Sequence, residues 1–75
     1  MKLIAKIERV IDNIRYLGIE YDLENLNHGV FLYYLLDKNF QTCQHDDWFL
    51  NIEIAKQAAF EGYEVKDDSW EEYKK

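Results

Sequence analysis

The feature that constrains this chain most is a run of seven apolar or aromatic residues, Val30–Leu36, near the middle of its 75 residues. The run is far shorter than the about 20 residues that a membrane-spanning helix needs, so the sequence predicts no membrane span. A helix that is apolar all round has neighbours on most sides or meets another chain. We therefore expect a central helix from about Leu23 or Asn25 to Lys38.

The first segment repeats its apolar residues with the period of an α-helix. Spacings of i, i+3, i+4 and i+7 place such residues on one side of a helix. Gly18 follows the last of them, where a left-handed helix cap favours glycine. The sequence predicts an amphipathic helix with this apolar stripe: Leu3, Ile4, Ile7, Val10, Ile11, Ile14 and Leu17.

A further long helix is predicted between Asp46, a suitable N-cap, and Gly62, a suitable C-cap. By contrast, apolar and acidic residues alternate over 19–23, which is typical of a strand. The fold that these patterns favour is all-α: a small three-helix bundle with a short fourth C-terminal helix, forming a single acidic helical domain over residues 1–75. The alternative is an α+β fold with a short strand near 19–23.

The last stretch, 67–75, surrounds two large aromatic rings with carboxylates. Asp67 or Asp68 can cap a short helix in which Trp70 and Tyr73 lie three residues apart and share a face. Two interpretations stay open: the rings pack against the core of a small domain, or they form part of a surface that binds another protein.

The charge is uneven along the chain, which carries a formal net charge of −6. Residues 1–18 hold four basic against two acidic residues, whereas residues 61–73 hold six acidic residues against Lys66 alone. This balance disfavours direct binding to nucleic acid or to an anionic membrane, because phosphate affinity requires Lys and Arg. It favours a protein partner with a basic surface, although an acidic surface also serves solubility alone.

Few residues offer chemistry. Ser69 is the only serine and suits a helix start better than a nucleophile. Cys43, His45 and His28 lack the spacing of zinc ligands or a positioned catalytic base. Adjacent carboxylates act as helix caps more readily than as an acid–base pair across a cleft. No glycine-rich phosphate loop is present. We therefore expect no enzyme, no cofactor and no metal.

The cellular compartment is inferred from two features. Cys43 is the only cysteine, so no disulfide can form within the chain, which suits a reducing compartment. Lys6, Glu8 and Arg9 interrupt the stretch that a secretory signal would need to be apolar. We expect a cytoplasmic protein.

The first functional hypothesis is a small adaptor or inhibitor that engages a basic surface of a larger protein. That partner could handle nucleic acid, with the module imitating phosphate charges as proteins encoded by phages or mobile elements do. The alternative is a self-associating structural protein, a homodimer in which Val30–Leu36 meets its copy. The predicted partner-binding residues are Glu61, Glu64, Asp67, Asp68, Trp70, Glu71, Glu72 and Tyr73, and the predicted self-association residues are Phe31, Tyr33 and Tyr34.

Overall fold

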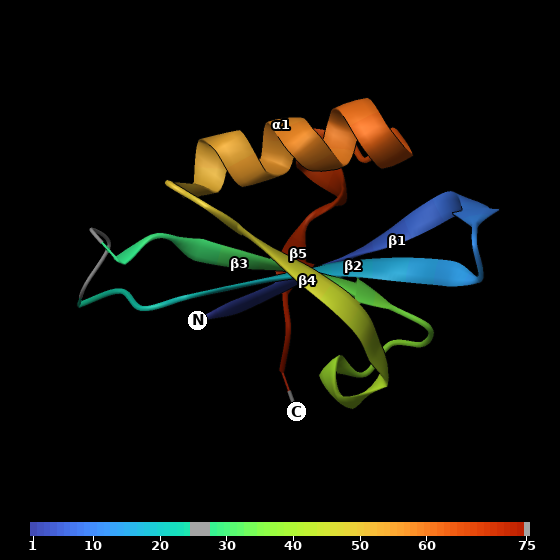
Figure 1. The fold of residues 1–75 in the computed structure, drawn as a ribbon, viewed down its shortest axis with the longest axis horizontal. Helices are drawn as coiled ribbons and strands as arrows, with labels where there is room; N and C mark the ends of the chain where they lie inside the picture. Colours follow the sequence, from blue (N-terminus) through green and yellow to red (C-terminus); the bar gives the residue numbers. More distant parts are fainter. Residues whose placement is uncertain (25–27, 75) are drawn as a thin grey trace.

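The computed structural model describes residues 1–24 and 28–74. These residues form a five-stranded antiparallel sheet with one α-helix on one face (Figure 1). The sheet order is β4-β3-β2-β1-β5. The elements are β1 Lys2–Ile11, β2 Ile14–Tyr21, β3 Val30–Leu35, the 3-10 turn η2 Phe40–Thr42, β4 Cys43–Phe49, α1 Ile52–Tyr63, the 3-10 turn η3 Asp67–Ser69 and β5 Glu71–Glu72.

The predicted all-α bundle is therefore wrong, and the acidic domain is mainly a β-sheet. The alternating residues 19–23 fall partly in β2, but the alternative fold placed one short strand where the structure has five. Within the described ranges, no helix has the length and apolar character required to span a membrane.

Residues 3–17 form a hairpin instead of the predicted first helix. The turn between β1 and β2 is made by Asp12 and Asn13, whose φ angles are 52° and 69°. Positive φ at both residues is the geometry of a type I′ turn, which suits Asp and Asn. The register also shifts between Lys6 and Ile11, and such an irregularity hides the simple alternation of a strand. Most of the apolar residues of this segment are β-branched, which favours strands over helices.

The run Val30–Leu36 is central, as expected, but it contains a strand and not a helix. β3 pairs with β2 on one side and β4 on the other. Val30 and Leu32 are buried under α1, and Leu35 is buried outside that cluster. A strand that is covered on both faces reads as a continuous apolar run, which periodicity alone does not distinguish from a buried helix. Asn25, one of the two predicted helix starts, lies outside the described residues.

Helix α1 begins later and ends differently than predicted. Asn51 is its N-cap, and the Asn51 side chain accepts a hydrogen bond of 2.9 Å from the Ile54 amide. Asp46, the predicted cap, lies in β4 instead. Gly62 lies inside the helix, and the left-handed residue at its end is Glu64, with φ of 59°. Asn is as good an N-cap as Asp, so the cap signal was present five residues further along.

The main core lies between α1 and the sheet. Ala55 and Ala59 are fully buried, and their small side chains let the helix approach the strands closely. The other members of this core come from β1, β2, β3 and the segment after the helix: Ala5, Ile7, Ile14, Leu17, Ile19, Val30, Leu32, Tyr34 and Val65.

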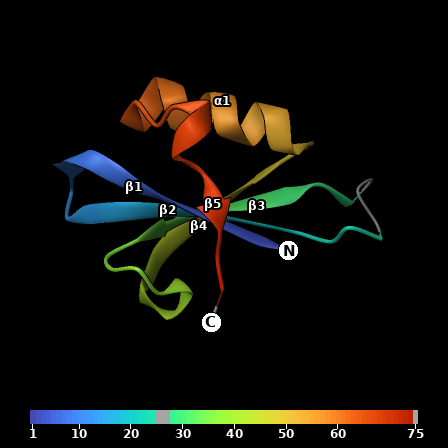
Figure 2. The same cartoon turned by 180° about the vertical axis from the view of Figure 1, so that it is seen from behind.

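The opposite face of the sheet is covered by the connection between β3 and β4, which lies on the side away from α1 (Figures 1 and 2). Phe40 of this connection lies over Gly18 of β2, where an added Cβ would stand 2.5 Å from the ring. The rings of Tyr33 and Tyr73 lie 5.5 Å and 4.9 Å from that of Phe40. Gly18 is thus required by a close approach and does not cap a helix.

The described residues 67–74 do not form the predicted C-terminal helix. Asp67–Ser69 is a short 3-10 turn, and the chain then pairs with β1 through β5. Side chains alternate between the two faces of a strand, so residues three apart point in opposite directions. Trp70 accordingly packs against the core under α1, whereas Tyr73 packs against Phe40 on the opposite face.

Candidate functional site

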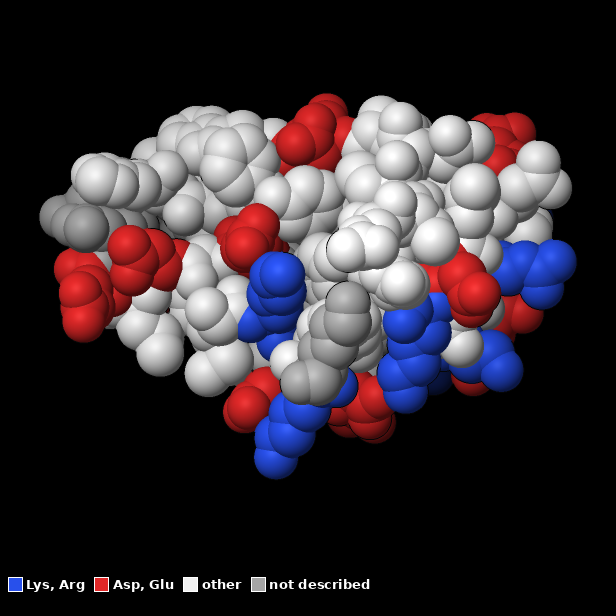
Figure 3. Space-filling model, turned by 90° about the horizontal axis from the view of Figure 1, so that it is seen from below, with Lys and Arg blue, Asp and Glu red and all other residues white. Residues whose placement is uncertain are grey.

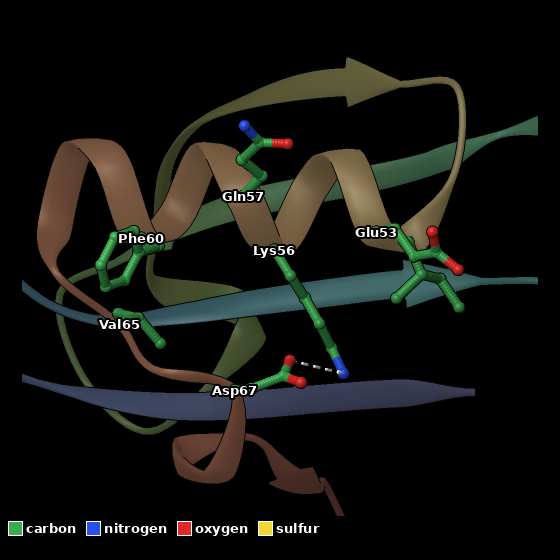
Figure 4. A pocket seen from close by; sticks show the side chains of 7 residues that line it. Glu53, Lys56, Gln57, Phe60, Val65 and Asp67 are labelled. Atoms are coloured by element: carbon green, nitrogen blue, oxygen red, sulfur yellow. Dashed lines mark ion pairs between the residues drawn. The ribbon is translucent and has the colours of Figure 1, made fainter.

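A groove runs along one flank of α1, between the helix and the segment that leads to β5 (Figure 4). Its volume is about 430 Å³. The helix and the following segment supply its lining: Ile52, Glu53, Lys56, Gln57, Phe60, Val65 and Asp67.

One wall of this groove is a flank of α1, and the other is the segment that follows the helix. Glu53, Lys56, Gln57 and Phe60 are spaced at i, i+3, i+4 and i+7, so they share one flank of the helix. The left-handed conformation after the helix turns the chain back. The Val65 amide then donates a hydrogen bond of 3.4 Å to the Ala59 carbonyl. The returning segment forms the second wall.

One ion pair joins the two walls. The ammonium of Lys56 lies 3.6 Å from the carboxylate of Asp67, and both side chains are drawn across the groove in Figure 4. Phe60, which is 54% exposed, lines the same groove. Since Asp67 balances Lys56, Glu53 remains the unbalanced charge of the lining. The groove therefore offers apolar contact bordered by negative charge.

The region around the groove is strongly acidic. From Ile52 to Glu72, seven carboxylates face two lysines, which gives a net charge of −5. Two of these carboxylates are in ion pairs: Asp67 with Lys56, and Glu71 with Lys38 at 3.4 Å. Within residues 1–24 and 28–74, the carboxylates of this region that form no ion pair are Glu53, Glu61, Glu64, Asp68 and Glu72, and all are exposed.

The structure separates the predicted partner-binding residues into several places. Asp67 lines the α1 groove, but Glu61 and Glu64 line a smaller cleft beside Arg9. Glu71 pairs with Lys38 on the face away from α1. Trp70 is partly buried against the core, and its indole nitrogen has no hydrogen-bond partner among the described residues. The aromatic rings thus fill the interior while the acids spread over the surface.

The face opposite α1 carries many of the basic side chains, which are mixed with acidic ones (Figure 3). Lys2 is 3.9 Å from Glu20 and its ammonium lies 5.1 Å from the centre of the Phe40 ring. Two of the predicted self-association residues lie on this face: Phe31, which is 42% exposed, and the half-buried Tyr33. The third, Tyr34, points into the core under α1 and is only 7% exposed.

Tyr33 and Tyr34 each bind a carboxylate. Their hydroxyls donate hydrogen bonds of 2.7 Å to Glu20 and Asp47 respectively. Burial, and then the hydrogen bond to the carboxylate, raises the pKa of each phenol above its usual value. His45 stacks on Tyr34 with ring centres 4.2 Å apart. Both phenols stay neutral at physiological pH and act as structural hydrogen-bond donors.

The one thiol of the chain lies at the start of β4. Cys43 is a free, exposed thiol that donates to the His45 carbonyl at 3.1 Å. Shielding of its sulfur from water raises the pKa of the thiol, which opposes nucleophilic reactivity. Within residues 1–24 and 28–74, no three His, Cys, Asp or Glu side chains gather as metal ligands.

Sequence reasoning missed the groove because its two walls come together only when the chain reverses after α1. A signal was nevertheless present, since Phe60 follows Lys56 and Gln57 at helical spacing. Comparison with protein-family models, with curated proteins and with solved structures finds no match for this chain.

Proposed function

We propose that this protein is a small acidic binding module, an adaptor or inhibitor, that engages a basic surface of a larger protein. The contact site is the α1 groove. The observation that carries the proposal is the exposed ring of Phe60 in an apolar groove that the acidic part of the chain surrounds. Aromatic side chains beside a pocket are frequent binding hot spots.

Charge and apolar contact have separate roles in this interaction. The carboxylates of α1 and the segment after it attract a basic surface at long range and repel acidic proteins. The groove then receives an apolar side chain of the partner, which slows dissociation because apolar surface is removed from water. Lys56 does not oppose this attraction, because Asp67 already neutralises it.

The partner class that fits is a protein rich in Lys and Arg at its binding surface, such as one that handles nucleic acid. A module with a net charge of −6 competes with nucleic acid for such a surface, as inhibitors encoded by phages or mobile elements do. The single free thiol of Cys43 suits the reducing cytoplasm.

Affinity capture from a bacterial lysate tests the proposal. The tagged protein is incubated at low salt, washed at low or high salt, and its captured partners are identified by mass. We expect a basic protein that is shed at high salt. Phe60→Ser and Glu53→Lys should each reduce its capture by at least about tenfold.

Two matched variants control for surface change elsewhere. Leu23→Ser removes an apolar side chain that is 60% exposed, and Glu24→Lys makes the same charge change away from α1. Both should retain capture, and the circular dichroism of all four variants should match the parent. Loss of capture in the controls, or its retention in both groove variants, would refute the groove as the binding site.

A further inference from the structure

A second surface lies on the other side of the molecule, at strand β4. This strand is the outermost one of the sheet, and among the described residues its outer side pairs with no strand. It is seven residues long and contains no Pro, Lys or Arg. Alternate amide and carbonyl groups of such an edge are ready to pair with another extended chain.

An exposed aromatic residue of this edge is held by contacts within the chain. Trp48 is 52% exposed, yet its indole N–H donates a hydrogen bond of 3.0 Å to the His28 carbonyl. Its ring lies directly on Gly29, where an added Cβ would stand 2.3 Å away. Trp48 also faces Phe31 across the strand pair. An incoming chain meets a rigid aromatic surface and loses little side-chain entropy on contact.

The charges of β4 decide which chain fits. Asp46 and Asp47 lie at the centre of the strand. The Asp47 carboxylate already accepts a hydrogen bond from the Tyr34 hydroxyl. If two copies paired antiparallel about Asp46, the two Asp46 carboxylates would face each other, and like charges directly opposite are destabilising. A lysine or arginine opposite Asp46 is favourable instead. The edge therefore disfavours a second copy and favours a basic strand.

The face of the sheet away from α1 already holds one cationic side chain against an aromatic ring. Lys2 holds its ammonium 5.1 Å from the Phe40 ring, a cation–π contact within the chain. Asp46 and Trp48 lie two residues apart on β4, so both side chains point to this face. A cationic side chain of an added strand can contact the carboxylate and the indole together.

We propose that β4 is a docking edge for an extended basic segment of a partner protein, which adds to the sheet as a further strand. Cationic residues of this segment lie beside Asp46 and Trp48. The alternate, apolar residues lie on the face of α1, where the helix carries the exposed side chain of Ile54. This surface is separate from the α1 groove, and the inference does not depend on the groove being used.

Peptide binding to the full-length protein tests this proposal. The probe is a peptide of the length of β4 in which Val and Lys alternate, and the matched control replaces each Lys with Glu. Binding is followed by Trp fluorescence and by hydrogen exchange of individual amides. We expect only the lysine peptide to bind and to slow exchange at the outer amides of β4, which water contacts in the free protein.

Three variants separate strand addition from simple charge attraction. Asp46→Lys should weaken binding by about tenfold or more, and Trp48→Leu should weaken it by a smaller factor. Glu53→Lys makes the same charge change in the α1 groove and should leave peptide affinity unchanged. Asp46 is exposed on an edge strand, so Asp46→Lys is expected to remain folded.

Several results would overturn the proposal. One is the absence of binding at millimolar peptide, and another is protection of amides outside β4. A loss of affinity in Glu53→Lys but not in Asp46→Lys would assign the peptide to the α1 groove. A dimer in analytical ultracentrifugation with β4 amides protected before peptide is added would show that a second copy occupies the edge.

Discussion

The two faces of the sheet are covered in very different ways. On one face a twelve-residue helix seals a continuous core in which Ala55 and Ala59 allow close packing. On the other, one ring from a connecting segment, Phe40, and one from the C-terminal segment, Tyr73, cover the strands. The helix face holds the fold together, whereas the opposite face leaves Phe31 and Trp48 exposed to solvent. A thin cover costs stability and leaves aromatic surface accessible for binding.

Adjacent residues of β3 give a direct comparison of the two faces. Tyr34 points under α1 and Tyr33 points the other way, and each donates a 2.7 Å hydrogen bond to a carboxylate on a neighbouring strand. The two hydrogen bonds are alike, but Tyr34 is more deeply buried than Tyr33. Paired mutations, one on each face of the sheet, therefore measure how much the packing on that face contributes to the free energy of unfolding.

The largest difference is expected for two fully buried leucines of β3. Leu32 packs in the core under α1, and Leu35 lies outside it on the opposite face. Leu32→Ala should reduce the free energy of unfolding by about 4 kcal/mol, because a helix-covered cavity cannot collapse. Leu35→Ala should lose only about 2 kcal/mol, because the segment carrying Phe40 can relax inward. Urea denaturation measures both, and an equal or larger loss for Leu35→Ala would contradict the comparison.

The second prediction concerns the contact between Gly18 and Phe40 on the face away from α1. Gly18→Ala places a Cβ 2.5 Å from the Phe40 ring, which must shift away. We expect a loss of about 1–2 kcal/mol, typical of moderate overpacking. Gly62→Ala is the matched control: nothing lies within 4 Å of its Cβ, and it is inside α1. That variant should gain about 0.5–1 kcal/mol from helix propensity. A neutral Gly18→Ala would show that Phe40 is not held there.

The hydrogen-bonded phenols of Tyr33 and Tyr34 should make the fold less stable at alkaline pH. Burial first, and then the bonded carboxylate, raises the pKa of both phenols in the folded state. The unfolded value is about 10, so the neutral phenols stabilise the fold fully below pH 10 and this contribution is lost as pH rises further. Unfolding by urea at pH 8 and at about pH 11 measures the loss. Tyr34→Phe should remove more of it than Tyr33→Phe, because Tyr34 is more deeply buried.

The smallest difference is expected for two ion pairs. Lys56–Asp67 crosses the α1 groove at 3.6 Å, and Lys38–Glu71 joins the opposite cover to β5 at 3.4 Å. Both lie near the surface, and each should contribute less than about 1 kcal/mol in a double-mutant cycle. The Lys56 pair should be the stronger and the less salt-sensitive, since its lysine side chain is the more buried of the two lysines. The reverse order would mean that the groove is more hydrated than its geometry indicates.

The failure of the helical prediction for residues 3–17 has a specific cause. An apolar pattern that passes through a bulge and a two-residue turn can match helical spacing by coincidence. Two local signals opposed the helix: the abundance of β-branched residues, and an Asp-Asn pair suited to a type I′ turn. The prediction for the later segment was closer, because three alanines and Glu, Lys and Gln favour a helix and α1 does form there.

The candidate site was harder to predict from the sequence than the fold was. The acids of the C-terminal region were identified correctly as exposed, but Trp70 and Tyr73 were placed on one face. Their spacing gives one face in a helix and two faces in a strand, so the error follows from the wrong element. The α1 groove forms only because Val65 and Asp67 fold back against the helix. No local sequence pattern predicts that reversal of the chain.

The sequence by itself determined the size, the uneven acidic charge, the central position of Val30–Leu36 and the presence of a helix near Ala55 and Ala59. Only the tertiary structure decided that the isoleucine-rich start pairs as strands, which faces the aromatic residues occupy, and where a groove and an open edge arise. The physical reason is the reach of the hydrogen bonds. A helix satisfies its backbone within a few residues, whereas a strand depends on partners that are distant in the chain.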